Sequence, residues 1–278
     1  MTASRALVLG GGGVTGIAWM TGLLHAFAQG GAELALADRI IGTSAGSVVG
    51  AQITSGIPLV ELYAEQTRPA DAEIGAEFPL TTMMRFMGHL VSPGDVRKRR
   101  ARLGAAARSA HPESGEQRIE VIRSRLGDLD WPATDLRITA VDADSGEFHV
   151  WTRRSGVPWI EAVASSCAVP LVWPPVEIEG RHYIDGGVRS STNADLAKGC
   201  ETVVVIAPLP KALTPSASIS RLLAHTGARR TAVVAPDEES LKAIGRNVLN
   251  PSRRIGAALA GYAQGQRLAG EMSAGWNA

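Results

Sequence analysis

The stretch "IIGTSAGSVVG", Ile40 to Gly50, joins a short apolar run to a helix-like pattern through a loop of small residues. The run Asp38–Ile41 is typical of a buried strand, and Ser44–Ser55 has the composition of a helix that ends at "SGIP". The junction, Gly-Thr-Ser-Ala-Gly, matches the Gly-X-Ser-X-Gly turn, which lifts a serine hydroxyl out of a sheet at a helix N-terminus. The stretch therefore predicts that Ser44 is a nucleophile, and another part of the chain must supply a group that takes its proton.

A second strand–loop–helix unit precedes this one. Arg5–Leu9, "RALVL", predicts a short strand, and "GGGGVTG", Gly10 to Gly16, follows it as a glycine loop. The helical spacing of the apolar residues in "IAWMTGLLHAFAQGG" then predicts a helix. Two such units in succession indicate an α/β protein with a largely parallel, buried central sheet.

The rest of the chain contains further helix and strand patterns, with no internal repeat and no linker-like segment. Helices are predicted over Leu59–Arg68, Thr81–Leu90 and Val96–Ala110, within "PWIEAVASSCAVP", and after Pro236 and Pro251. A β-hairpin is predicted over Asp135–Val141 and Glu147–Trp151, and strands over "RHYID", Thr202–Ile206 and Thr231–Val234. We expect a single domain over residues 1–278, with a variable helical segment at about 69–131 that could act as a lid.

The composition is that of a globular protein without a strong charge bias. Hydrophobic residues make up 45% of the 278 residues and charged residues 20%, and the formal net charge is +1. This charge does not favour a nucleic-acid partner, and two cysteines, Cys167 and Cys200, do not form a disulfide framework. The glycine-rich apolar stretches are poor membrane spans and the N-terminus is a poor signal peptide, so we expect a cytoplasmic protein.

The glycine loop is compatible with two chemistries. Gly11, Gly13 and Gly16 satisfy the dinucleotide fingerprint Gly-X-Gly-X-X-Gly, but the end of the next strand, where a nucleotide-binding protein needs an acidic residue, reads "GTSAG". Alternatively, backbone N–H groups of glycines at the mouth of a helix form an oxyanion hole for acyl transfer. Because loops after adjacent parallel strands share one edge of a sheet, we expect Gly11–Gly13 to lie beside Ser44.

A carboxylate ends a third predicted strand, in "YIDGG", where Asp185 precedes two glycines. Asp-Gly-Gly on its own is an ordinary turn. Partial burial makes a carboxylate a stronger base, so Asp185 could accept the proton of Ser44 directly. The alternative base is His225, which follows Asp185 in the order of a Ser-Asp-His triad, although "RLLAHTGARR" gives it no strand-end position.

The glycine loop, Gly-X-Ser-X-Gly and Asp-Gly-Gly, in this order, resemble the patatin-like phospholipase family, which uses a Ser-Asp dyad without a histidine. The stretch "ASSCAVPLVWPPVEIEGRHYIDGG" is similar to the family's approach to its aspartate, and "PDEESLKAIGRNVLNPSRRIGAALAGYAQG" is similar to bacterial members. The resemblance covers most of the chain, is weakest at about 69–131, and implies a three-layer α/β/α fold. Thr15 departs from the pattern, because the family often has Arg or Lys there.

Carried over residue by residue, the resemblance makes Ser44 the nucleophile, Asp185 its base, and the amides of Gly11, Gly12 and Gly13 the oxyanion hole. It implies a lipid acyl hydrolase of phospholipase A, lysophospholipase or esterase type, which forms an acyl-enzyme and needs no metal or cofactor. A lipid-binding or scaffold protein of the same fold without turnover stays open. So do the headgroup, the acyl-chain length, the acyl acceptor and the oligomeric state.

Several side chains bear on the substrate. The residues that could line an acyl-chain channel, or belong to the core, are Trp19, Phe27, Trp159, Val169, Leu171 and Trp173. The basic run Arg97–Arg100 with Arg102 could meet anionic headgroups during a transient, peripheral contact with a membrane, or form a solvated helix face. Asp142, Asp144 and Glu147 resemble a calcium loop but lack the EF-hand spacing, so we expect a solvated turn.

Overall fold

The computed structural model describes residues 4–69, 79–111, 113, 115–127, 130–212 and 214–278. Parts of the segment expected at about 69–131, namely residues 70–78, 112, 114 and 128–129, lie outside the described residues. All strands of the described chain belong to one sheet of eight, in the order β5-β6-β3-β2-β1-β7-β8, with β4 paired to β3. The strands are β1 (Arg5–Leu9), β2 (Arg39–Gly42), β3 (Asp135–Asp142), β4 (Phe148–Trp151), β5 (Val176–Ile178), β6 (Arg181–Asp185), β7 (Thr202–Ile206) and β8 (Arg230–Val234).

The sheet is parallel over most of its width. Strands β8, β7, β1, β2 and β3 run in the same direction, whereas β4, β5 and β6 form antiparallel pairs at the β3 side. The largely parallel sheet predicted from the strand–loop–helix units is therefore confirmed. The carboxyl ends of β1 and β2 are adjacent in register, with Leu9 opposite Gly42, so the loops that follow them meet at one edge.

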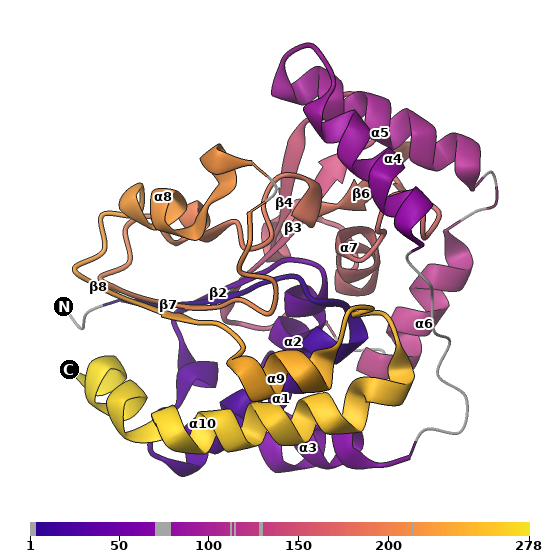
Figure 1. Cartoon of the computed structure of the whole chain (residues 1–278). Coiled ribbons are helices and arrows are strands. Elements are labelled where there is room, and N and C mark those ends of the chain that lie inside the picture. The colour runs from indigo at the N-terminus through magenta and orange to yellow at the C-terminus, as the bar shows by residue number, and fades with distance from the viewer. Residues whose placement is uncertain (1–3, 70–78, 112, 114, 128–129, 213) are drawn as a thin grey trace.

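Helices cover both faces of the sheet and complete three layers (Figure 1). One face carries α1 (Gly13–Gln29), α2 (Ala45–Thr54), α3 (Leu59–Thr67), α6 (Glu116–Leu126), α7 (Trp159–Ser166), α9 (Glu238–Ile244) and α10 (Arg254–Asn277). The other face carries α4 (Leu80–Val91), α5 (Val96–Ala110) and α8 (Ile219–Ala224). Alternating strand residues separate the two cores: Leu7 and Leu9 of β1 face the α1 side, and Ala6 and Val8 face the α8 side.

Close approach of α1 and α10 anchors the C-terminal helix. A Cβ atom at Gly261 would lie 2.1 Å from the Trp19 carbonyl oxygen, and one at Gly22 would lie 2.2 Å from the Ala258 carbonyl oxygen. The two helix backbones are therefore in direct contact at these glycines. The buried Trp19 indole N–H also donates to Oε1 of Gln264, at 3.2 Å, which satisfies a polar group inside the contact.

Local patterns predicted most elements, and the exceptions are short or polar. The helix over Val96–Ala110 has the predicted bounds, and the hairpin is formed by β3 and β4. One strand and two α-helices were not predicted. Strand β5 has three residues, α8 has six residues, and α6 contains many charged residues. Each is too short or too polar to show a clear period of its own.

The glycine contact makes a testable prediction about stability. Gly261→Ala should lower the free energy of unfolding by about 1–3 kcal/mol, because the new methyl group overlaps the Trp19 backbone. Gly270→Ala is a matched control in the same helix, because a Cβ there meets nothing within 4 Å, and it should raise the free energy of unfolding by up to about 1 kcal/mol. Urea unfolding followed by circular dichroism measures both. Equal changes in the free energy of unfolding for the two substitutions would contradict the close contact between α1 and α10.

Candidate active site

Ser44 lies on a strained turn between β2 and α2. Its backbone has φ 53° and ψ −119°, a conformation that non-glycine residues adopt rarely and mainly where function needs it. Position 46 must be a glycine, because a Cβ atom there would lie 1.9 Å from the Leu9 carbonyl oxygen. Ser44 is 9% exposed and stands at the N-terminus of α2, so the predicted nucleophile elbow has the expected geometry.

The glycine loop lies against Ser44, as expected from the topology. A Cβ at Gly11 would be 3.5 Å from the Ser44 Cβ. The Gly11 N–H, however, donates to the Ser191 carbonyl at 2.8 Å, so this amide is already occupied. Among the residues that the structure describes, none accepts a hydrogen bond from the N–H groups of Gly12 and Gly13, where α1 begins. These two amides are therefore free donors at the mouth of α1.

The Ala45 N–H is a third free donor that the sequence interpretation missed. Ala45 is the first residue of α2, and its N–H has no acceptor within the described part of the chain. In nucleophile elbows the amide after the serine contributes to the oxyanion hole. Its position could have been read from the Gly-X-Ser-X-Gly pattern alone.

Asp185 ends β6 and is 5% exposed. Its Oδ1 accepts the Gly187 N–H at 2.7 Å, within the short 3₁₀ turn Gly186–Val188 that follows the strand. This bond fixes the carboxylate against the turn that follows the strand. In β3, which lies between β2 and β6, Ala140 is paired with Asp185 and Ile138 with Gly42, so Ser44 and Asp185 follow strands on either side of β3.

Three consecutive residues at the end of α7 hold both predicted catalytic residues. The Ser44 N–H donates to Oγ of Ser166 at 2.9 Å, and Sγ of Cys167 donates to the Ser44 carbonyl at 3.4 Å. The next residue, Ala168, accepts the Asp185 N–H at 3.0 Å. Ser44 and Asp185 therefore share one short support, although they are far apart in the sequence. The role of Ser166–Ala168 was not predicted, because the sequence shows them only as small residues.

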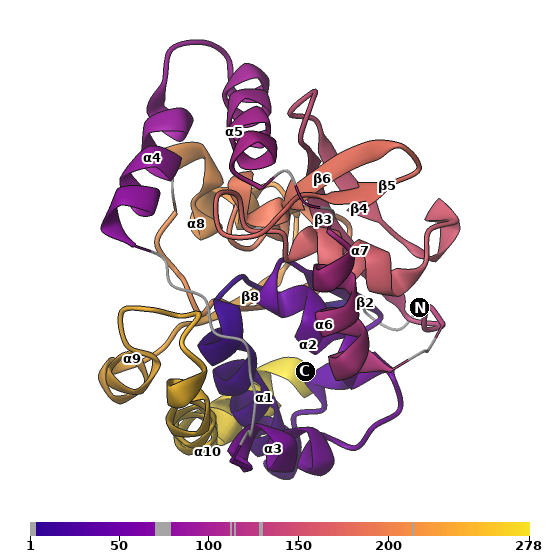
Figure 2. The ribbon, with the colours of Figure 1, turned by 90° about the vertical axis from the view of Figure 1, so that its right-hand side faces the viewer.

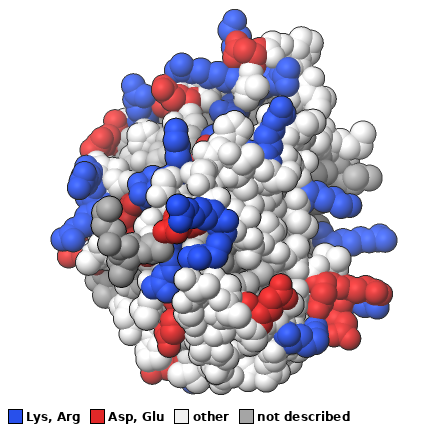
Figure 3. All heavy atoms as spheres, turned by 90° about the vertical axis from the view of Figure 1, so that its left-hand side faces the viewer, with Lys and Arg blue, Asp and Glu red and all other residues white. Residues whose placement is uncertain are grey.

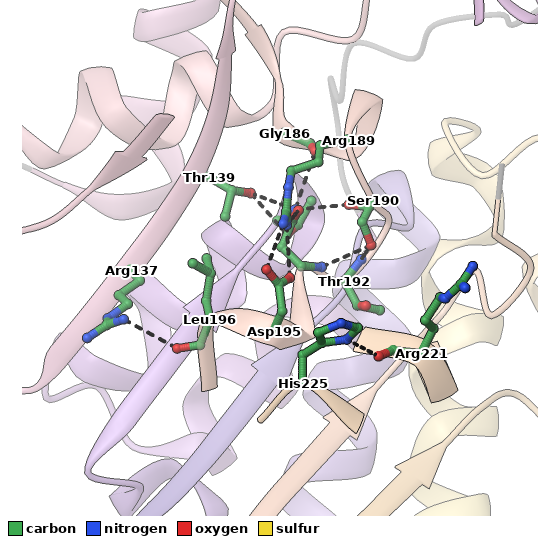
Figure 4. Close-up of polar contacts among 12 residues, drawn as sticks. Arg137, Thr139, Gly186, Arg189, Ser190, Thr192, Asp195, Leu196, Arg221 and His225 are labelled. Atoms are coloured by element: carbon green, nitrogen blue, oxygen red, sulfur yellow. Dashed lines mark hydrogen bonds and ion pairs between the residues drawn. The ribbon is translucent and has the colours of Figure 1, made fainter. Parts of the chain in front are cut away.

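A buried amide makes a second link between the two residues. The Asn193 side-chain NH₂ donates to Oγ1 of Thr43 at 3.0 Å, to Oγ1 of Thr139 at 3.3 Å and to the Gly186 carbonyl at 3.3 Å. Thr43 precedes Ser44, and Gly186 follows Asp185. Thr139 Oγ1 also lies 3.0 Å from Thr43 Oγ1, and Figure 4 shows Thr139, Gly186 and Ser190 around these contacts. Asn193 and both threonines are completely buried, so the network is shielded from water.

Two arginines lie close to the aspartate loop. Arg189 forms a two-pronged ion pair with Asp195, at 2.9 and 2.6 Å, and stacks on the Phe148 ring at 4.2 Å. Burial, and then the neighbouring Arg189 charge, hold the pKa of Arg100 below its ordinary value. Nε of Arg100 is buried and has no partner among the described residues. Arg100, the last residue of the predicted basic run Arg97–Arg100, therefore lies beside this loop, whereas the charge of Arg189 is balanced by Asp195.

His225 is not near the proposed nucleophile. It is exposed, and its Nδ1 lies 2.7 Å from the Arg221 carbonyl of its own helix turn, as Figure 4 shows. This geometry does not support a Ser-His-Asp triad. The nucleotide-binding alternative also lacks an acidic anchor, because Asp38 lies at the amino end of β2, where Oδ2 accepts the Arg5 N–H at 2.7 Å.

The carboxylates of the turn between β3 and β4 pair with arginines. Asp144 contacts Arg108 at 2.5 Å, and Glu147 contacts Arg97 at 2.9 Å. Asp142 accepts the N–H groups of residues 144 and 145 at 3.0 and 2.7 Å. Burial alone would raise the pKa of Asp142, but these hydrogen bonds outweigh it and lower the pKa.

A cleft of about 910 Å³ opens between α1, α2 and α3. Val14 and Ile17 of α1 and Val48 of α2 form part of its wall. Helix α1 begins in the glycine loop, and α2 begins directly after Ser44. Three of the four aromatic residues considered for an acyl channel belong to the core: Trp19, Phe27 and Trp159 are at most 2% exposed and do not line this cleft.

Comparisons with known proteins agree with this arrangement. The patatin-like phospholipase family model matches residues 7–198. Lysophospholipase nte1 of Aspergillus oryzae is 28% identical over 208 residues, covering 73% of this chain, and the protein of the same name from Aspergillus niger is 28% identical over 209 residues. The chain spans only 12% of the length of these curated relatives.

Two solved structures resemble the whole chain more loosely. VipD from Legionella pneumophila has a TM-score of 0.48 at 11% identity, covering 98% of this chain and 67% of that protein. The type III effector protein ExoU has a TM-score of 0.42 at 13% identity, covering 98% of this chain and 54% of that protein. The family model matches more than half of the chain and includes both Ser44 and Asp185. The chain therefore belongs to the patatin-like phospholipase family of lipid ester hydrolases.

Proposed function

We propose that the chain cleaves carboxylic ester bonds of lipids by acyl transfer through Ser44 and Asp185. The observation that carries the proposal is the support they share, in which Ser166 and Cys167 bond to Ser44 and the next residue, Ala168, bonds to Asp185. Two residues from distant parts of the sequence are thus held at one sheet edge. The strained backbone of Ser44 supports the same conclusion, because such strain is retained mainly at functional positions.

The proposed reaction has two steps. As Ser44 Oγ attacks the ester carbonyl carbon, its proton passes to the Asp185 carboxylate, and the N–H groups of Gly12, Gly13 and Ala45 bind the oxyanion. The C–O bond then breaks, and the leaving alkoxide takes the proton from Asp185. Water repeats the sequence on the acyl-enzyme and releases a carboxylic acid. Every proton transfer in this scheme is made by Asp185. An alcohol could replace water as the acyl acceptor.

The substrate class is proposed from the family and from the relatives. The Aspergillus proteins are named lysophospholipases, and we extend lipid-ester hydrolysis to this chain. The guanidinium of Arg100, whose buried Nε has no partner among the described residues, suits an anionic headgroup near the aspartate loop. A lipid-binding protein without turnover is the second candidate, and the experiments below separate it from an enzyme.

The hairpin of α4 and α5 is the proposed contact with the membrane surface. Met84, Val91 and Val96 are 66%, 68% and 53% exposed, and α4 and α5 lie side by side at one end of the molecule in Figures 1 and 2. Exposed apolar side chains flanked by cations are typical of interfacial helices. On the face near the chain termini, by contrast, Figure 3 shows Lys and Arg interspersed with Asp and Glu.

Part of the predicted basic run serves to brace this hairpin. Arg97 pairs with Glu147, and Lys98 lies 3.8 Å from Asp95. Arg99 and Arg102 donate to Gly94 and Pro93 carbonyls of the α4–α5 loop, and within the described chain neither has a carboxylate partner. Their charge therefore stays available to anionic headgroups. No helix of the described residues is both long enough and apolar enough to span a bilayer.

The dyad predicts which variants lose activity. Ser44→Ala and Asp185→Asn should each lower turnover of p-nitrophenyl butanoate by about a thousandfold or more, because each removes one member of a unit that acts together. His225→Ala should keep wild-type turnover, since its ring bonds only within its own helix turn. Circular dichroism controls for folding. Full activity in either dyad variant would disprove the mechanism, and lipid binding without any ester turnover by the wild type would favour the second candidate.

The Asn193 network predicts that removing its amide disturbs the position of Ser44 relative to Asp185. Asn193→Gly keeps the left-handed backbone, which has φ 50° and ψ 38°, but removes the amide that links Thr43 to Gly186. We expect kcat to fall by about tenfold or more while KM changes little, because the substrate-binding surface is untouched. Reaction of Ser44 with a fluorophosphonate probe should slow in parallel. Asn250→Gly removes an exposed turn-capping amide and is the control. Unchanged kcat in Asn193→Gly would show that the network has no positioning role.

The hairpin predicts separate control of membrane binding. Met84→Asp combined with Val91→Asp should weaken sedimentation with phosphatidylglycerol vesicles by about tenfold or more, because both exposed apolar contacts are lost and charge is added. Turnover of p-nitrophenyl butanoate in solution should not change. Leu259→Asp, at a side chain 52% exposed on α10, is the matched control. Undiminished vesicle binding by the double variant would rule the hairpin out.

A further inference from the structure

The outer edge of β8 is unpaired. Strand β8 ends the sheet, and Figure 1 shows it at the outer side of its single neighbour, β7. The Arg230 N–H donates at 3.1 Å to the carbonyl of Glu201, which leads into β7. Because alternate residues of a strand point their backbone groups to opposite sides, Thr231 and Val233 present theirs outward. Within the described chain, the N–H and C=O groups of these two residues have no hydrogen-bond partner.

The central residues of β8 lack the features that usually prevent edge pairing. Pairing with β7 is continuous from Arg230 to Val234, without a bulge, and the strand contains no proline or lysine. The side chains of Thr231 and Val233 are exposed, that of Val233 by 48%. An edge of this kind is a template on which another strand can pair.

A groove of about 620 Å³ follows this edge on the α10 side. The residues of α10 that line it are apolar or small apart from one carboxylate: Leu268, Glu271, Met272, Gly275 and Trp276. Arg230 lines the groove from β8 and donates to the Thr202 hydroxyl at 3.1 Å. Neither Arg230 nor Glu271 forms an ion pair with any residue that the structure describes. The groove therefore holds a cation and a carboxylate that do not neutralise each other.

We propose that β8 pairs antiparallel with β8 of a second copy of this chain, about a two-fold axis at Ala232. In this register Thr231 of each copy lies opposite Val233 of the other, and opposite residues of such a pair exchange both N–H···O bonds. All the free backbone groups of the edge are then satisfied. Moving the axis by one residue would require Arg229, whose N–H is already bonded, or Ala235, whose carbonyl is already bonded.

The same register matches the charges of the groove. Arg230, Ala232 and Val234 alternate onto the face of β8 that packs toward α10. Arg230 of each copy lies opposite Val234 of the other, so its guanidinium extends into the groove that contains the other copy's Glu271. Each copy gives one cation and receives one, as a two-fold contact between identical surfaces requires.

The charge of this face favours a second copy over a lipid surface or a nucleic acid. Figure 3 views the molecule from this side and shows Lys and Arg interspersed with Asp and Glu. Anionic surfaces would be repelled by these carboxylates, whereas a self-complementary contact needs both signs. A two-fold axis perpendicular to the sheet also keeps its faces distinct, so α4 and α5 of both copies stay on the α8 face.

Sedimentation velocity of the wild type over a range of concentrations is the first measurement. We expect a monomer–dimer equilibrium with a Kd of about 1–100 µM, as for other small interfaces. Val233→Pro removes an outward N–H without touching the bonds to β7, so the variant should fold and dimerise about tenfold or more weakly. Val233→Thr keeps both backbone groups and is the matched control, with a Kd within about threefold of the wild type. Circular dichroism verifies folding.

A charge exchange tests the register. Glu271→Arg and Arg230→Glu should each weaken dimerisation by about tenfold or more, because each creates two like-charge contacts per dimer. The two substitutions combined should restore the wild-type Kd within about threefold. Glu33→Arg, at an exposed carboxylate away from β8, is the control and should leave the Kd unchanged. A wild type that stays monomeric up to about 200 µM, undiminished dimerisation of Val233→Pro, or no restoration in the combined variant would overturn the proposal.

Discussion

The contact between the Leu9 carbonyl and the start of α2 is the constraint on which the site depends. That oxygen accepts the Thr43 N–H at 3.0 Å, and Gly46 packs so closely against it that a Cβ would lie 1.9 Å away. The chain must therefore reverse direction within a few residues at the end of β2. Ser44 takes up the strain, with φ 53°, at a cost of about 1–3 kcal/mol. The position of its hydroxyl follows from the packing of β1 under α2.

Such strain persists only where the surroundings hold it, and here buried hydrogen bonds do so. The end of α7 binds both polar backbone groups of Ser44, while Asn193 binds the preceding Thr43 from the other side. The same segments bind the backbone of Asp185 and the carbonyl of Gly186. Because Asn193 and Thr139 are completely buried, a partly broken network would leave polar groups without water, so the arrangement should be lost or kept as a whole.

Local patterns in the sequence account for the parts of the fold that form locally. The two strand–loop–helix units could be predicted, because strand, glycine turn and helix each have a period or a turn signal. The hydrogen bonds from Asn193 to Thr43 and Thr139 could not be predicted, because they join side chains more than 50 residues apart in the sequence. Nor could the bond from the Gly11 N–H to the Ser191 carbonyl, which occupies one of the three amides that were expected to form an oxyanion hole. Predicting which amides are free requires the tertiary structure.

The proposed function assigns chemistry and substrate contact to different parts of the connection between β2 and β3. Its ends are fixed, because Gly42 and Ile138 are paired in the sheet and Ser44 follows directly. Its middle forms α3, which walls the cleft, and the exposed hairpin of α4 and α5. A substitution on the exposed faces of α3, α4 or α5 alters the surface of this connection, whereas the hydrogen bonds that hold Ser44 come from the end of α7. This separation gives a physical reason to expect the weakest resemblance to the family at about 69–131, in the exposed middle of the connection.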